Sequence, residues 1–120
     1  TAMGFAKRVD LAVIGVGNPN QRSTWNQLGY FGDKEMAVIK QDQIKGDAVA
    51  SLFDKNGQTV DNTISKRMLG IKVEDLAHIP QVMVIGSGSE KAESIHPLLV
   101  GNYCSILVTN QTTAESLLVM

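Results

Sequence analysis

The sequence predicts an α/β fold in which a mostly parallel sheet is flanked by helices. Three short apolar runs carry this prediction, because each is rich in β-branched residues and too short to form a buried helix. They are residues 10–15, 81–86 and 105–109. Helical patterns separate or follow them, and such alternation is typical of a parallel sheet. Because parallel strands normally lie between two layers of helices, we expect all three runs to be buried on both faces of the sheet.

Four segments have helical patterns. They are residues 33–40, 73–77, 89–99 and 112–118. The third of these contains Pro97, which lacks a backbone donor, so we expect this helix to be short or distorted near its end, with Gly101 just beyond it. The fourth has Thr112 and Glu115 at the spacing of a capping box. The second is expected to form one or two turns that stop before Pro80.

The segment from residue 46 to residue 70 has a different pattern. Residues 48–53 fit either a strand or a helix, residues 54–57 are a turn signal that ends in Asn56-Gly57, and residues 58–60 are expected to be extended again. Asn-Gly favours the positive φ angles of a tight turn. We therefore predict a hairpin over residues 48–60, inserted into or placed beside the parallel sheet. The pattern shows no internal domain boundary.

Composition excludes several classes of protein. The chain has 120 residues, which suits one domain or a piece of a larger one, and 11 Lys and Arg against 12 Asp and Glu give a charge of -1. This balance excludes a strongly basic surface for nucleic acid or anionic lipid. No apolar run approaches the length of about 18 residues that a membrane span needs. With one cysteine, Cys104, and no ligand spacing around His78 or His96, we expect a reducing cytoplasmic setting, no disulfide and no metal site.

Two glycine-rich segments follow predicted strands, and ligands of parallel sheets bind at the carboxyl ends of strands. The first contains Gly15 and Gly17, and the second contains Gly86, Ser87 and Gly88. Glycine lets backbone N–H groups approach an anion, and a helix that starts after the loop adds a partial positive charge. Neither segment completes a dinucleotide fingerprint or a Walker loop, so a simple tight turn is the alternative.

Charged and aromatic residues near these loops are candidate ligand contacts. Lys91 lies in the first turn of the predicted helix, where a lysine is otherwise unfavourable and therefore suggests an anionic partner. Asp47 is either an acceptor for ligand hydroxyls or a turn-capping residue. Arg67 is either a second phosphate contact or a surface arginine. Trp25, together with Tyr30 and Phe31, either lines a pocket or covers the core.

An ordered series of motifs resembles the latter half of the sugar-binding domain of SorC-family bacterial transcriptional regulators. The series covers nearly the whole chain, and although each motif is weak alone, their succession is fairly specific. The matching segments are residues 9–19, 23–25, 29–31, 46–47, 53–57, 67–71, 75–76, 79–80, 86–91 and 107–109. The resemblance implies a Rossmann-like fold related to the sugar-phosphate isomerase and CoA-transferase group, with an inserted hairpin.

The resemblance also implies a function. The ligand would be a phosphorylated sugar or related metabolite that acts as an effector, with Asp47 contacting sugar hydroxyls and Lys91 contacting the ligand, often its phosphate. No cofactor is implied. Family members form homo-oligomers and bind DNA through a separate domain, so residues 1–120 would be a partial effector domain without its first half and without the DNA-binding domain. The family loop usually reads Gly-Gly, and Ser87 departs from it in a way that would tune or weaken the pocket.

Two other functions remain open at the level of sequence. One is a sugar-phosphate isomerase-like enzyme, in which Asp47 would be the general base and Lys91 the phosphate anchor. No second acid or base occupies a convincing position, which counts against this reading. The other is an oligomerisation module that has lost ligand binding through the change at Ser87.

Overall fold

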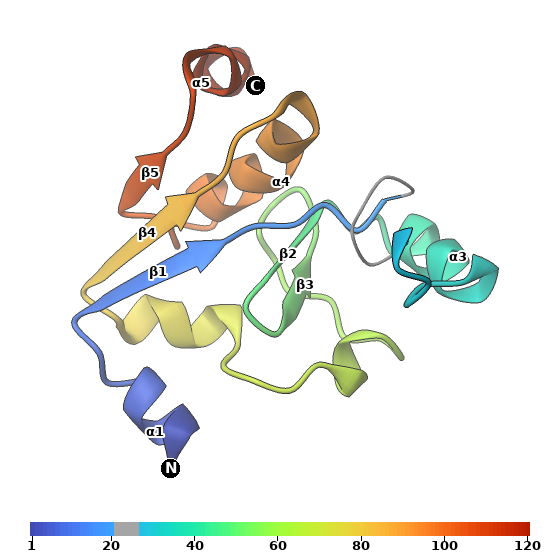
Figure 1. The fold of residues 1–120 in the computed structure, drawn as a ribbon, viewed down its shortest axis with the longest axis horizontal. Helices are drawn as coiled ribbons and strands as arrows, with labels where there is room; N and C mark the ends of the chain where they lie inside the picture. The colour runs from blue at the N-terminus through green and yellow to red at the C-terminus, as the bar shows by residue number, and fades with distance from the viewer. Residues whose placement is uncertain (21–26) are drawn as a thin grey trace.

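A three-stranded parallel sheet forms the centre of the molecule (Figure 1). The structure is a computed structural model that describes residues 1–20 and 27–120. The strands are β1 (Leu11–Gly15), β4 (Gln81–Ile85) and β5 (Ile106–Val108), in the order β1-β4-β5. Neighbouring strands are parallel, and the register pairs Val13 with Met83 and Met83 with Ile106. The predicted parallel sheet and its three strand segments are confirmed.

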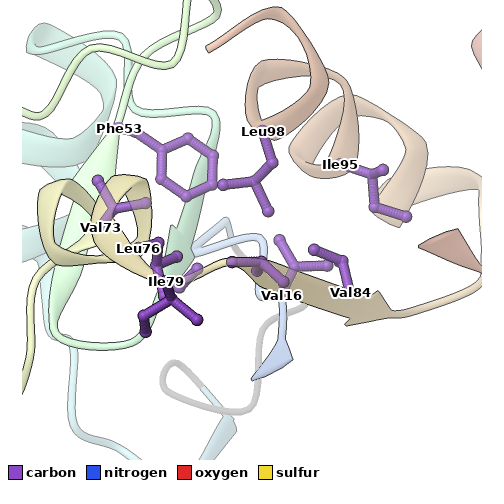
Figure 2. Packing of buried hydrophobic residues seen from close by; sticks show 10 residues of the cluster. Val16, Phe53, Val73, Leu76, Ile79, Val84, Ile95 and Leu98 are labelled. Carbon is purple, nitrogen blue, oxygen red and sulfur yellow. The ribbon is translucent and has the colours of Figure 1, made fainter. Parts of the chain in front are cut away.

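One face of this sheet is covered by η2 (Val73–His78) and α4 (Ser89–Val100). Val82 and Val84 of β4 point to this side and are buried. Figure 2 shows Ile95 and Leu98 of α4 close to Val84, with the side chains of η2 and of Phe53 completing the cluster. The ten buried residues of this cluster are Val16, Ala48, Phe53, Val73, Leu76, Ile79, Val82, Val84, Ile95 and Leu98.

The opposite face of the sheet carries exposed apolar side chains. Val13 is 58% exposed and Ile85 is 47% exposed, whereas Val84, which precedes Ile85 on β4, is fully buried. The expectation that the strands are buried on both faces is therefore wrong. The physical reason is that the described helices near the sheet lie on its other side. There α4 packs with α5 (Gln111–Leu118), and η2 approaches the end of α1 (Ala2–Ala6).

The predicted hairpin exists but has a different turn. Its strands are β2 (Gly46–Ala48) and β3 (Ser51–Phe53), joined at Val49-Ala50. Residues 48–53 are therefore not one strand, and Val49 takes a φ of 47°, which is rare for a β-branched residue. Tertiary bonds stabilise this turn, because the Ala50 N–H donates to the Ile71 carbonyl at 3.0 Å and the Lys72 ammonium donates to the Ala50 carbonyl at 2.7 Å.

The Asn-Gly turn is confirmed as a second reversal of the chain. Gly57 has a φ of 79°, and the Asp54 N–H donates to the Gln58 carbonyl at 3.0 Å. A single bridge then pairs Phe53 with Thr59. Residues 46–60 therefore fold back twice, first at Val49 and again at Gly57.

The helix ends differ from the predictions in two places. The predicted helix at 89–99 runs to Val100 and includes Pro97 without interruption, and Gly101 follows its end as expected. Its burial against the core cluster compensates for the one backbone bond that proline cannot make. Helix α5 is capped by Asn110, whose side chain accepts from the Thr113 N–H at 2.9 Å. The capping box of Thr112 and Glu115 is therefore wrong, because the capping residue lies two positions before Thr112.

A second, smaller apolar cluster joins α3 (Asp33–Gln41) to the hairpin and to the short helix η1 (Ser65–Arg67). Its buried residues are Ile39, Ile44, Leu52 and Ile64. Helix α3 confirms the amphipathic segment predicted at residues 33–40. Of the helices in residues 1–20 and 27–120, none has both the length and the apolar character that a membrane crossing requires.

Candidate functional site

The segment after β1 connects two of the predicted ligand contacts. Gly17 forms an antiparallel bridge with Asp47 of β2, in which each backbone N–H donates to the other residue's carbonyl at 2.8 Å. A Cβ atom at Gly17 would lie 2.5 Å from the Asp47 Oδ2 atom. Only glycine therefore lets the Asp47 carboxylate lie directly against this backbone. The predicted closeness of the first glycine loop and Asp47 is found in the structure.

Lys91 reaches the same segment from the other side. It lies in the first turn of α4, and its ammonium donates to the carbonyl of Val16 at 2.5 Å. Asp47 and Lys91 therefore contact adjacent residues, Gly17 and Val16, although they are 44 positions apart in the sequence. Both side chains are partly exposed. A lysine ammonium and an aspartate carboxylate therefore lie at one edge of the sheet, at the carboxyl ends of its strands.

The second glycine loop offers fewer backbone donors than its sequence suggests. The Gly86 N–H donates to the Val108 carbonyl at 3.1 Å, and the Gly88 N–H donates to the Thr113 hydroxyl at 2.9 Å. These two donors are occupied by the protein itself. Gly88 adopts a φ of 123° as the residue before α4, so the glycine is needed there for its conformation. Ser87 is exposed, and its N–H and that of Ser89 have no bond to the described residues.

Glu90 is a residue that the sequence reasoning missed. It lies beside Lys91 in the first turn of α4, and its carboxylate would be 3.4 Å from a Cβ atom at Gly88. An acidic side chain stabilises a helix N-terminus, and here it occupies the position where a bound anion would be stabilised by the same helix end. The sequence signal for it is the Glu90-Lys91 pair directly after the loop.

A cavity of about 380 Å³ lies next to Asp47. Arg67, Tyr30 and Phe31 line it, together with apolar side chains of the hairpin and of residues 64–69. Lys91 does not line this cavity, so Asp47 lies between the cavity and the segment that Lys91 contacts. The Arg67 side chain is exposed and forms no ion pair with the described residues. Trp25 lies outside the described residues.

The cysteine and the two histidines considered as candidates lie in helices or beside the core. Cys104 is half-buried beside the main core cluster, and its thiol donates to the Ile106 carbonyl at 3.3 Å. Burial raises the pKa of this thiol, which makes the thiolate less available. His78 ends η2 and His96 lies within α4.

Together, the fold and this site define a small-molecule-binding α/β domain, and comparison with known proteins identifies its family. The model of the putative sugar-binding domain matches residues 1–119. The chain therefore belongs to the family of sugar-binding domains found in transcriptional regulators, as its resemblance to the SorC regulators predicted.

Two curated relatives are named for their regulatory roles. The chain is 32% identical over 113 residues to the deoxyribonucleoside regulator of Bacillus subtilis, covering 94% of this chain and 36% of the relative. It is 32% identical over 118 residues to the sorbitol operon regulator of Klebsiella pneumoniae, covering 98% and 38%. The chain thus spans little more than a third of the length of these relatives.

Solved structures show the same fold. The full-length sorbitol operon regulator of Klebsiella pneumoniae aligns with a TM-score of 0.86 at 32% identity, covering 96% of this chain and 37% of that one. A DeoR family transcriptional regulator from Listeria monocytogenes aligns with a TM-score of 0.90 at 25% identity, covering 96% and 47%. The sugar-binding domain of a transcriptional repressor from Vibrio fischeri aligns with a TM-score of 0.83 at 30% identity, covering 97% and 47%.

Proposed function

We propose that this chain is the effector-sensing part of a cytoplasmic transcriptional regulator and that its ligand is a phosphorylated sugar. The observation that carries this proposal is the meeting of Asp47 and Lys91 at the Val16-Gly17 step. The carboxylate accepts hydrogen bonds from sugar hydroxyls. The ammonium, supplemented by the N–H groups of Ser87 and Ser89, holds the phosphate. Membership of the sugar-binding domain family supports the sugar, and the lysine supports the phosphate.

The cavity beside Asp47 is the place for the sugar. Its volume of about 380 Å³ lies within the range of small-molecule sites, and its wall combines Asp47 and Arg67 with apolar and aromatic side chains. A ligand that extends from this cavity past Asp47 towards Val16 brings its phosphate to Lys91. Gly15, Gly17, Gly86 and Gly88 shape this edge of the sheet rather than bind the ligand by their side chains.

Regulation follows from coupling between this site and the rest of the regulator. A ligand shifts a conformational equilibrium only by binding one state more tightly than the other. Glu90 provides a local difference, because its carboxylate lies at the start of α4 and a phosphate there would displace it. In a homo-oligomeric regulator, this displacement at α4 would reach DNA through a domain outside residues 1–120. The chain itself is a sensor without catalytic turnover.

A binding assay tests the site with matched variants of the chain. Titration calorimetry is run with pentose, hexose and hexitol phosphates and with the same sugars without phosphate. For the phosphate that binds, we expect Lys91→Ala to raise Kd by about tenfold or more, as expected for loss of a charged hydrogen bond. Lys55→Ala removes the same charge from the exposed turn at residues 54–57 and leaves Kd unchanged. Asp47→Asn weakens binding of sugars with and without phosphate by similar factors.

Three results would contradict this assignment. Equal Kd values for Lys91→Ala and Lys55→Ala would remove Lys91 from the site. Absence of binding by every sugar phosphate at millimolar concentration would favour the oligomerisation module instead. Interconversion of aldose and ketose phosphates by the chain, lost in Asp47→Asn, would establish the isomerase-like enzyme.

A further inference from the structure

The cavity beside Asp47 has two walls that come from distant parts of the sequence. The first wall is the hairpin of β2 and β3, and the second wall is the segment of residues 64–69. Asp47 lies in β2, two residues before the turn at Val49-Ala50. The place of its carboxylate relative to the second wall therefore depends on how this turn is attached. The residues that form the walls are Asp47, Val49, Ala50 and Leu52 on the first and Ile64, Arg67, Met68 and Leu69 on the second.

The side chain of Lys72 joins the two walls. Its ammonium donates to the Ala50 carbonyl at 2.7 Å and to the Met68 carbonyl at 3.2 Å. Ala50 and Met68 both line the cavity, one on each wall, whereas Lys72 does not line it. Lys72 is half-buried and forms no ion pair with the described residues, so these two carbonyls stabilise its charge.

The turn that Lys72 contacts is strained. Val49 has a φ of 47°, a conformation that β-branched residues rarely adopt and that persists only where surrounding contacts enforce it. Both backbone polar groups of Ala50 supply such contacts. Its N–H donates to the Ile71 carbonyl at 3.0 Å, and its carbonyl accepts from the Lys72 ammonium.

Other bonds attach the hairpin without reaching the second wall. They are the backbone bond of the Ala50 N–H and a bond of 2.9 Å from the Val73 N–H to the Ser51 hydroxyl, both at the start of η2. These bonds remain when the Lys72 side chain is shortened or loses its charge. Removal of the ammonium therefore breaks the link between the two walls while the hairpin keeps its attachment to η2.

We infer that Lys72 is a positioning residue of the ligand site. It fixes the turn at Val49-Ala50 relative to the second wall, and thereby the distance between the Asp47 carboxylate and that wall. A site that is already arranged for its ligand binds more tightly, because less conformational freedom is lost on binding. The inference rests on the proposed function, since it concerns the cavity in which the sugar would bind.

Titration calorimetry of Lys72→Met tests the inference with three probes, which are ribose 5-phosphate, glucose 6-phosphate and sorbitol 6-phosphate. For each probe that the unmodified chain binds, we expect Kd to rise by about tenfold through the loss of preorganisation. Lys72→Arg should stay within about threefold of the unmodified chain, because a guanidinium can donate to both carbonyls. As the control, Lys45→Met removes the same charge from a half-buried side chain that pairs with Glu93 at 3.3 Å, outside this cavity, and leaves Kd unchanged.

Amide hydrogen exchange, measured without any sugar, separates positioning from a general loss of stability. In Lys72→Met we expect the Ala50 N–H to exchange at least about tenfold faster, because its turn opens locally. The Asp47 N–H, which donates to the Gly17 carbonyl at 2.8 Å, should keep its rate. Acceleration of both amides by the same factor would indicate a purely structural residue and would overturn the inference.

The calorimetry distinguishes failure of this inference from failure of the proposed function. Binding that is weakened by Lys91→Ala and unchanged by Lys72→Met would overturn the inference alone. So would equal increases of Kd in Lys72→Met and Lys45→Met, or an unchanged exchange rate of the Ala50 N–H in Lys72→Met. Absence of binding of all three probes to the unmodified chain at millimolar concentration would contradict the proposed function and, with it, this inference.

Discussion

The two faces of the parallel sheet are built from the same kinds of residue and have opposite environments. Val84 and Val13 are both strand valines, yet Val84 is 0% exposed and Val13 is 58% exposed. The side chains of Ile95 and Leu98 cover the first, as Figure 2 shows, and no described helix covers the second. An apolar strand sequence therefore predicts that the strand will be buried. It does not specify which other segment of the fold covers it.

The comparison also explains where the candidate site lies. The site is at the carboxyl edge of the sheet, where β1 and α4 approach the hairpin through Gly17, Asp47 and Lys91. All of these contacts come from elements on the covered side. The uncovered face contributes Gly15, whose position allows another backbone to approach.

The largest expected effect is at the covered face. Leu98→Ala removes a fully buried side chain from the main cluster and should lower the free energy of unfolding by about 3 kcal/mol, through lost burial and the cavity left behind. Leu118→Ala makes the same change where the side chain is 84% exposed and should change it by less than about 0.5 kcal/mol. Urea denaturation measures both. Similar losses in the two variants would contradict the described core.

A smaller effect should separate the two faces directly. Val84→Thr places a hydroxyl in the core with little change of volume and should cost about 2 kcal/mol. Val13→Thr makes the identical change on the uncovered face, where water reaches the hydroxyl, and should stay within about 0.5 kcal/mol in residues 1–120. The same denaturation experiment applies to both. A loss at Val13 as large as that at Val84 would mean that the uncovered face is already buried in this chain.

The smallest effect concerns Cys104, which lies against the covered cluster. Burial raises the pKa of its thiol, so the unfolded chain ionises at a lower pH than the folded chain. Below the pKa that the thiol has in the unfolded chain, its ionisation does not change the free energy of unfolding. The free energy of unfolding then falls as the pH rises from that value towards the pKa of the thiol in the folded chain. Reaction with a disulfide reagent at pH 8 should be slower than that of Val13→Cys in a Cys104→Ser background. Faster reaction at Cys104 would contradict its burial.

Local patterns were sufficient for the elements of the fold. β-Branched apolar runs specified the three strands, and the Asn56-Gly57 pair specified its turn, because both depend on the conformational preferences of the residues themselves. The turn at Val49 had no such signal. Its positive φ is maintained by Ile71 and Lys72, which approach only after the chain has folded.

The candidate site was predictable in its composition and not in its details. The glycine loops, Asp47 and Lys91 were identified from residue type, position after strands and family resemblance. The occupation of the Gly88 N–H by Thr113 and the position of Glu90 were not, because each depends on how α4 meets its neighbours. Arg67 was identified, but its presence at the same cavity as Asp47 came only from the structure.

The sequence alone determined which segments become strands and helices and which chemical groups follow them. Short-range sterics and the alternation of apolar residues set these features within a few residues of each position. Only the tertiary structure decided that Asp47 pairs with Gly17 while Lys91 donates to the neighbouring Val16 carbonyl, and that one face of the sheet stays uncovered. Both depend on contacts between residues far apart in the chain, whose geometry no local preference encodes.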